Sequence, residues 1–90
     1  MELGLKAIKN RFAARKLADK RKAATEEASR EIRPVCRMGE HGELINEIVV
    51  YGMPLFQVSD NDGRWNVKTD DVGDVIKHLR DAYVAKIMNQ

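Results

Sequence analysis

The chain has 90 residues, with 16 Lys or Arg against 14 Asp or Glu, and a net charge of +2. This length allows one domain, near the lower size limit of chains that fold without metals or disulfides. Apolar residues make up 43% of the chain, which is close to ordinary globular composition and predicts a modest core. We therefore treat residues 1–90 as a single domain.

Several classes of protein are disfavoured by what the sequence lacks. No apolar stretch approaches the roughly 18 residues that a membrane-spanning helix needs, and the first residues do not resemble a secretion signal. Cys36 is the only cysteine, so an intrachain disulfide is excluded. We expect a cytoplasmic protein that does not associate with membranes.

Charge is distributed unevenly along the chain. Residues 1–22 contain eight basic and two acidic residues, a net charge of +6. Residues 23–90 contain eight basic and twelve acidic residues, a net charge of −4. Such asymmetry predicts a basic interaction arm attached to a slightly acidic body.

The first 32 residues are predicted to form a long helix, since they are rich in strong helix formers and contain no proline. The spacing of Leu5, Ile8 and Phe12 predicts a narrow apolar seam, from which Leu17 drifts away. A thinner stripe of small or apolar residues follows at Ala24, Ala28 and Ile32.

The predicted helix is too long for a small globular body. Unbroken, it would measure about 45 Å, whereas the remaining residues would form a unit of about 25–35 Å. Thr25, followed by two glutamates, resembles a helix N-cap, so the sequence leaves open whether the helix is continuous or broken there. In either case, the basic part should protrude or pair with something.

Short strands are predicted after Pro34, which disfavours continuation of the helix. We expect an edge strand over 34–38, a turn over 39–42, a central strand over 44–51 and a turn over 52–54. Residues 55–59 and 64–69 then flank Asp-Asn-Asp-Gly, a sequence typical of a hairpin loop.

The hairpin loop at 60–63 has two possible registers. A two- or four-residue loop opposes Val58 to Trp65 and Phe56 to Val67, which places all four side chains on one face of the sheet. A three-residue loop with a bulge opposes Val58 to Asn66 instead. Burial of the apolar side chains favours the first register.

The last helix is predicted to begin at two aspartates, which suit the positive end of its dipole. A broad apolar stripe follows and should cover the sheet face that carries Phe56 and Trp65. The stripe is formed by Val72, Val75, Ile76, Leu79, Tyr83 and Ile87.

The expected fold class is α+β in the order α-β-β-β-α. The antiparallel sheet should have three strands, or four if one more short strand forms. Residues 1–32 would be the basic helical arm, and residues 33–90 the compact sheet-and-helix unit.

Catalytic and metal-binding patterns are weak. His41 lies in a glycine-flanked turn and His78 lies beside the apolar stripe, both positions typical of solvated histidines. If Gly63 is aligned as the turn glycine of a calcium loop, Val58 and Thr69 fall at positions that require carboxylates. We expect a protein that is not an enzyme and that holds neither a cofactor nor a metal.

The basic helix is the strongest functional candidate. Its cations could bind the phosphates of a nucleic acid, which we take as the leading hypothesis for a small regulatory binding protein. Alternatively, the helix could dock on an acidic protein surface through its apolar seam, as in an adaptor or inhibitor of the type that phages encode. Homodimerisation through the seam (Leu5, Ile8, Phe12 and Leu17) is compatible with both. The candidate binding residues are Lys6, Lys9, Asn10, Arg11, Arg15, Lys16, Lys20, Arg21 and Lys22.

One short segment resembles a known DNA-contacting helix. Asn10, Ala13 and Ala14 match the Asn-x-x-Ala-Ala core of basic-leucine-zipper proteins. The next positions of that family, a Ser or Cys and an Arg, are Leu17 and Ala18 here, and no leucine heptads follow. We do not assign the chain to that family, although the match adds Asn10 to the residues worth testing.

Overall fold

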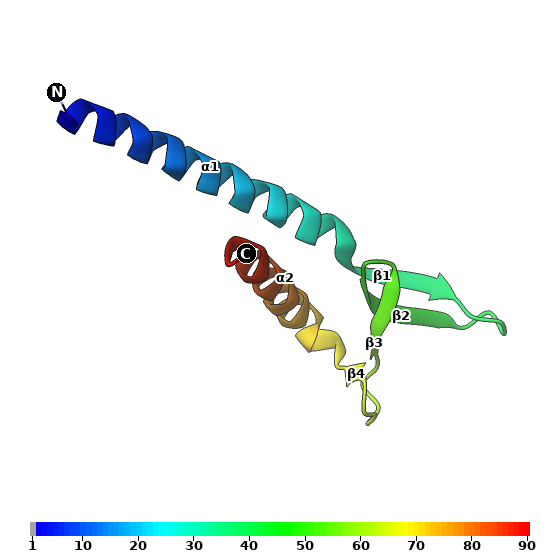
Figure 1. The fold of residues 1–90 in the computed structure, drawn as a ribbon. Helices are drawn as coiled ribbons and strands as arrows, with labels where there is room; N and C mark the ends of the chain where they lie inside the picture. Colours follow the sequence, from blue (N-terminus) through cyan, green and yellow to red (C-terminus); the bar gives the residue numbers. More distant parts are fainter. Residues whose placement is uncertain (1) are drawn as a thin grey trace.

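The computed structural model describes the backbone of residues 2–90 and the side chains of residues 14–90. Two helices enclose a run of four strands, so the expected α+β class is confirmed (Figure 1). The elements are α1 (Glu2–Glu31), β1 (Ile32–Met38), β2 (Leu44–Val50), β3 (Met53–Val58), β4 (Asn66–Val67), the short 3-10 helix η1 (Thr69–Asp71) and α2 (Val72–Met88).

Helix α1 is continuous, which settles the question left open at Thr25. The hydroxyl of Thr25 donates to the carbonyl of Arg21, one turn earlier, at 2.8 Å. This is a bond that a helical threonine makes within its own helix, and it does not act as an N-cap. The helix ends at Glu31, and β1 begins with the next residue.

The first three strands form an antiparallel meander. Pairing of β1 with β2 opposes Ile32 to Val50 and Met38 to Leu44. The turn between β2 and β3 consists of Tyr51 and Gly52, both with positive φ (51° and 77°). Two such residues make a type I′ turn, which suits the twist of a hairpin. The turn therefore lies earlier than predicted, and β3 already begins at Met53.

The predicted hairpin at 60–63 is wrong, because β4 runs parallel to β3 and the sheet is mixed. Val58 lies opposite Val67, so Trp65 does not take the place predicted for it. The carboxylate of Asp60 accepts the backbone N–H of Thr69 at 3.0 Å, which closes the loop across nine residues. This bond joins the start of the loop to the first residue of η1.

The core lies between one sheet face and both helices. Its buried members are Ala28 from α1, Ile76 from α2, and Ile32, Ile48 and Val67 from the strands. Phe56, Val58 and Leu79 pack against this cluster, which confirms that α2 covers the predicted face. Trp65 is the exception: its side chain is 59% exposed, although its ring centroid lies 6.1 Å from that of Phe56.

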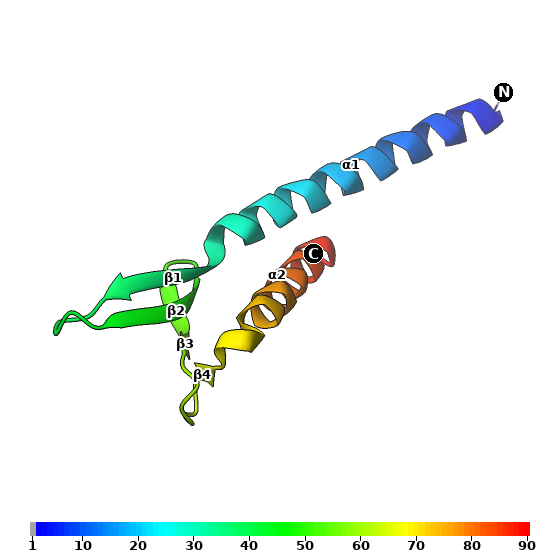
Figure 2. The same ribbon diagram turned by 180° about the vertical axis from the view of Figure 1, so that it is seen from behind.

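The molecule is long and thin. Its principal extents are 72 × 21 × 19 Å and its radius of gyration is 19.3 Å, against about 12 Å for a compact 90-residue domain. Its accessible surface is 7527 Å², about 2,200 Å² more than a compact monomer of this mass exposes. Much of the length comes from α1, which runs well past the end of α2 (Figures 1 and 2).

Candidate functional site

The body of the protein reaches only part of the way along α1. The ammonium of Lys20 lies 3.4 Å from the backbone oxygen of Gln90, so the end of the chain meets α1 near this residue. Further toward the C-terminus of α1, Ala24 and Ala28 are buried, which confirms the predicted stripe of small residues. Toward the N-terminus, both ribbon views show α1 continuing without another element beside it (Figures 1 and 2).

The predicted cations of residues 15–22 lie on both sides of this contact at Lys20. Arg15, Lys16, Arg21 and Lys22 are exposed, and Lys20 is half-buried. Leu17, the last residue of the predicted seam, is exposed among them. The remaining predicted residues lie outside the described side chains; they are Leu5, Lys6, Ile8, Lys9, Asn10, Arg11 and Phe12.

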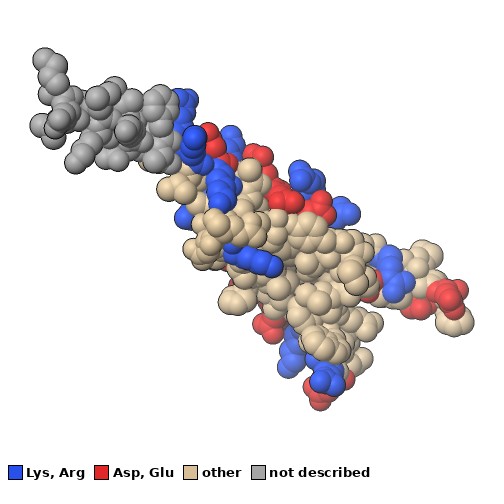
Figure 3. All heavy atoms as spheres, in the orientation of Figure 1, with Lys and Arg blue, Asp and Glu red and all other residues tan. Residues whose placement is uncertain are grey.

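Among the described side chains, no Asp or Glu forms an ion pair with these cations. The ion pairs found among residues 14–90 join Arg30 to Glu31, Arg37 to Glu47, and Lys77 to Asp81, and none involves a cation of residues 15–22. In the space-filling view, Lys and Arg gather where the described part of α1 leaves the body, and Asp and Glu are visible both along α1 and at the far end of the β1–β2 hairpin (Figure 3). Within residues 15–22, the five cations outnumber the single acidic residue, Asp19.

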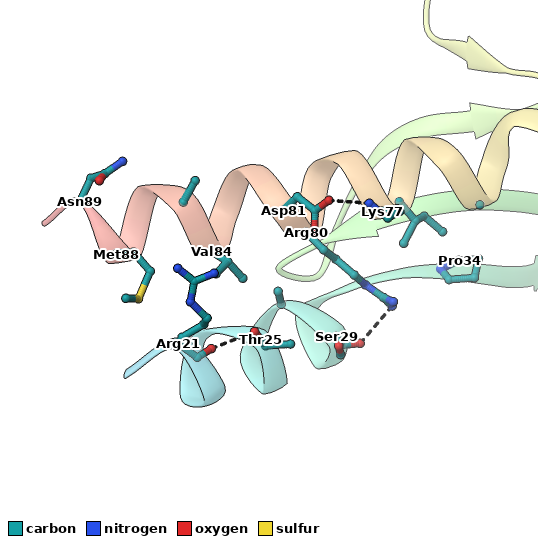
Figure 4. A pocket seen from close by; sticks show the side chains of 14 residues that line it. Arg21, Thr25, Ser29, Pro34, Lys77, Arg80, Asp81, Val84, Met88 and Asn89 are labelled. Atoms are coloured by element: carbon teal, nitrogen blue, oxygen red, sulfur yellow. Dashed lines mark hydrogen bonds and ion pairs between the residues drawn. The ribbon is translucent and has the colours of Figure 1, made fainter. Parts of the chain in front are cut away.

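A groove between α1 and α2, which the sequence did not predict, has a volume of about 800 Å³ (Figure 4). Its apolar lining includes Ala28, Ile76, Val84 and Met88, and Pro34 lines it as well. Three cations also line it: Arg21, Lys77 and Arg80. Thr25, Ser29, Asp81 and Asn89 line it too, so the groove combines apolar and polar residues and carries an excess of positive charge.

Two of the three cations that line the groove have partners within the chain. The guanidinium of Arg80 donates to the carbonyls of Ile32 (2.9 Å) and Ser29 (3.3 Å), where α1 ends. The ammonium of Lys77 lies 2.9 Å from the carboxylate of Asp81, and this hydrogen bond and the charge of Asp81 raise the pKa of Lys77. Arg21 forms no ion pair within residues 14–90.

The described part of the chain contains no cluster of metal-ligating side chains. Among residues 14–90, no group of three or more His, Cys, Asp or Glu side chains is placed to hold a metal ion. Asp60, the first residue of the calcium-like sequence, instead binds Thr69. In the glycine-flanked turn, the N–H of His41 donates to the carboxylate of Glu43 at 2.9 Å. Cys36 is exposed as a free thiol on β1.

Comparison of the chain with protein-family models, curated proteins and solved structures finds no match. In the part of the chain that the structure describes, neither helix has a stretch long and apolar enough to cross a membrane. The function must therefore be argued from the charge and shape of the chain.

Proposed function

We propose that the chain is a non-enzymatic nucleic-acid-binding protein whose basic helix α1 contacts the phosphate backbone. The observation that carries the proposal is the run of five cations at residues 15–22, for which the ion pairs found within residues 14–90 include no Asp or Glu partner. Four of the five are exposed, and exposed cations without carboxylate partners are well suited to replace the counterions of a nucleic acid.

Helical geometry presents these cations on more than one side of α1. Arg15 and Lys22 are seven residues apart and therefore share a face. Lys16 and Lys20 are four residues apart and share another face. A phosphate backbone lying along α1 could meet cations on successive turns. Because cations that contact phosphates carry no sequence information, we expect weak sequence preference.

The test is the salt dependence of binding. A labelled mixed-sequence DNA duplex and its RNA equivalent are titrated with the full chain between 50 and 200 mM salt, with fluorescence anisotropy as the readout. If all five cations contact phosphates, the logarithmic salt slope is about −4.5, and affinity falls about 500-fold over this range. A slope near zero would contradict the proposal.

A matched pair of triple variants separates α1 from total charge. Reversing Lys16, Lys20 and Arg21 to Glu should abolish detectable binding. The control reverses Arg64, Lys68 and Lys86 to Glu, which changes the net charge equally at exposed positions outside α1. The control should keep most of the salt slope. Equal losses in the two variants would show that only net charge matters.

The exposure of Leu17 among the cations favours a second candidate, an adaptor or inhibitor whose helix docks on an acidic protein surface. Under this alternative, Leu17→Ser should weaken capture of a protein partner and leave the thermal melt of the free chain unchanged. A pull-down from nuclease-treated lysate separates the two candidates. A stoichiometric protein that survives nuclease treatment and is lost with Leu17→Ser supports the adaptor, whereas loss of all partners after nuclease supports nucleic-acid binding.

A further inference from the structure

The outer part of the β1–β2 hairpin exposes large apolar side chains. Met38 is 70% exposed and its cross-strand partner Leu44 is 71% exposed. The next pair along the ribbon, Cys36 with Asn46, is also exposed. The hairpin projects beyond α2 in both ribbon views, so the helix does not cover these pairs (Figures 1 and 2).

This hairpin surface is continuous with the groove between α1 and α2. Side chains two residues apart on a strand point to the same face, so Pro34, Cys36 and Met38 share one face of β1. Pro34 lines the groove. One track of apolar residues therefore runs from Met88 along the groove, past Pro34, to Met38 near the hairpin tip, with polar side chains beside it in the groove.

We infer that a second copy of the chain covers this track, in a symmetric dimer whose two-fold axis passes near Pro34. Rotation about such an axis lays the hairpin of each copy along the groove of the other. The hairpin segment and the groove are of similar length. Pro34 to Met38 spans about 13 Å of strand, and Ile76 to Met88, which line the groove, span about 18 Å of helix.

Charge complementarity supports this pairing of hairpin with groove. The hairpin tip carries two exposed glutamates, Glu40 and Glu43. The groove rim carries Arg21, Lys77 and Arg80, with only Asp81 among its lining residues as a carboxylate. Opposite charges at the edges of an apolar contact fix its register and disfavour other alignments.

The inferred interface shares one residue with the proposed nucleic-acid-binding segment. Arg21 lines the groove and is also one of the five cations of residues 15–22. The other four cations lie outside the groove lining, so variants that leave Arg21 unchanged distinguish loss of the dimer from loss of nucleic-acid binding.

Sedimentation equilibrium of the full chain at several concentrations tests the inference. We expect a reversible dimer that the double substitution Met38→Glu with Leu44→Glu weakens at least about 30-fold. Both side chains are largely exposed in the single copy, so its thermal melt at dissociating concentration should not fall. The control is Met53→Glu, which is 72% exposed on the β2–β3 hairpin and lies outside the track. A chain that is monomeric at every concentration, or a dimer weakened equally by Met53→Glu, would overturn the inference.

Cross-linking tests the arrangement itself. In a Cys36→Ser background, Met38→Cys combined with Met88→Cys places a thiol on the hairpin and another in the groove. Mild oxidation should give a disulfide-linked dimer containing the Met38–Met88 pairing, identified by peptide mapping. The matched chain with Met53→Cys and Met88→Cys should remain uncross-linked. Equal cross-linking of the two chains, or a dimer sensitive to Leu17→Glu but not to the Met38 and Leu44 changes, would refute this arrangement.

Discussion

The guanidinium of Arg80 joins α2 to the point where α1 passes into β1. Carbonyls at the end of a helix lack partners within the helix. Arg80 donates to one of these carbonyls, that of Ser29 in the last turn of α1, and to the carbonyl of Ile32, the first residue of β1. Its charge also lies at the negative end of the dipole of α1. Arg80→Met keeps the aliphatic stem of the side chain and removes both hydrogen bonds and the charge.

The expected loss follows from these two bonds. A hydrogen bond from a charged donor contributes about 1.5–3 kcal/mol, but the bond to Ser29 is long at 3.3 Å and exposed. We expect Arg80→Met to lower the free energy of unfolding by about 2–3 kcal/mol. In urea, where a chain of this size has an m-value of about 1 kcal/mol per molar, the midpoint should fall by about 2–3 M.

The control for Arg80 is an arginine at the same end of α1. Arg30 is exposed and forms an ion pair with its neighbour Glu31 at 3.5 Å, a kind of pair that contributes less than about 1 kcal/mol. Arg30→Met removes the same charge without removing bonds to the terminal carbonyls. Unfolding is followed by circular dichroism at equal, dissociating protein concentration. If Arg80→Met costs no more than Arg30→Met, the proposed role of Arg80 is refuted.

Two further predictions concern the core and the pH dependence of stability. Ile48 is the largest fully buried side chain found in the described part of the chain, so Ile48→Ala should lower the free energy of unfolding by about 3 kcal/mol, measured by urea titration beside Met53→Ala as an exposed control. The hydroxyl of Tyr83 donates to Glu27, which raises the pKa of this tyrosine above its ordinary value of 10.0. Because the folded-state pKa is the higher one, this stabilisation is complete below about pH 10 and is lost as the pH rises through the folded-state value. Tyr83→Phe should therefore flatten the fall of stability above pH 10, and an unchanged pH profile would contradict this.

Patterns within single elements predicted most of the fold. The 3.6-residue periodicity of the C-terminal stripe located α2, and the small residues Ala24 and Ala28 marked the face of α1 that packs. The path from β3 to β4 was not predictable in the same way. Local residues at 60–63 favour a tight turn, but the bond between Asp60 and Thr69 links residues that local propensity treats as independent.

The two proposed interaction surfaces differ in how far the sequence reveals them. The cationic segment is a property of consecutive residues, so net charge alone located it. The groove exists because α1 packs beside α2, which brings Arg21 and Thr25 into the same lining as Ile76 and Met88. Segments more than forty residues apart meet there, and a single sequence carries no signal of that meeting. The exposure of Met38 and Leu44 could not be predicted for the same reason, because it depends on how far α2 extends along the β1–β2 hairpin.

The continuity of α1 gives the cationic segment a defined position. Arg15 lies nine residues, about 13 Å, before the buried Ala24, and α1 is continuous between them. The cations are therefore held at a set distance and rotation relative to the core, unlike those of a disordered basic tail. In the inferred dimer, the two-fold axis reverses one α1 relative to the other, so the two cationic segments would point in opposite directions. Such a dimer would present phosphate-binding segments at its two ends, which suits contact with two separate stretches of nucleic acid more than a clamp on one.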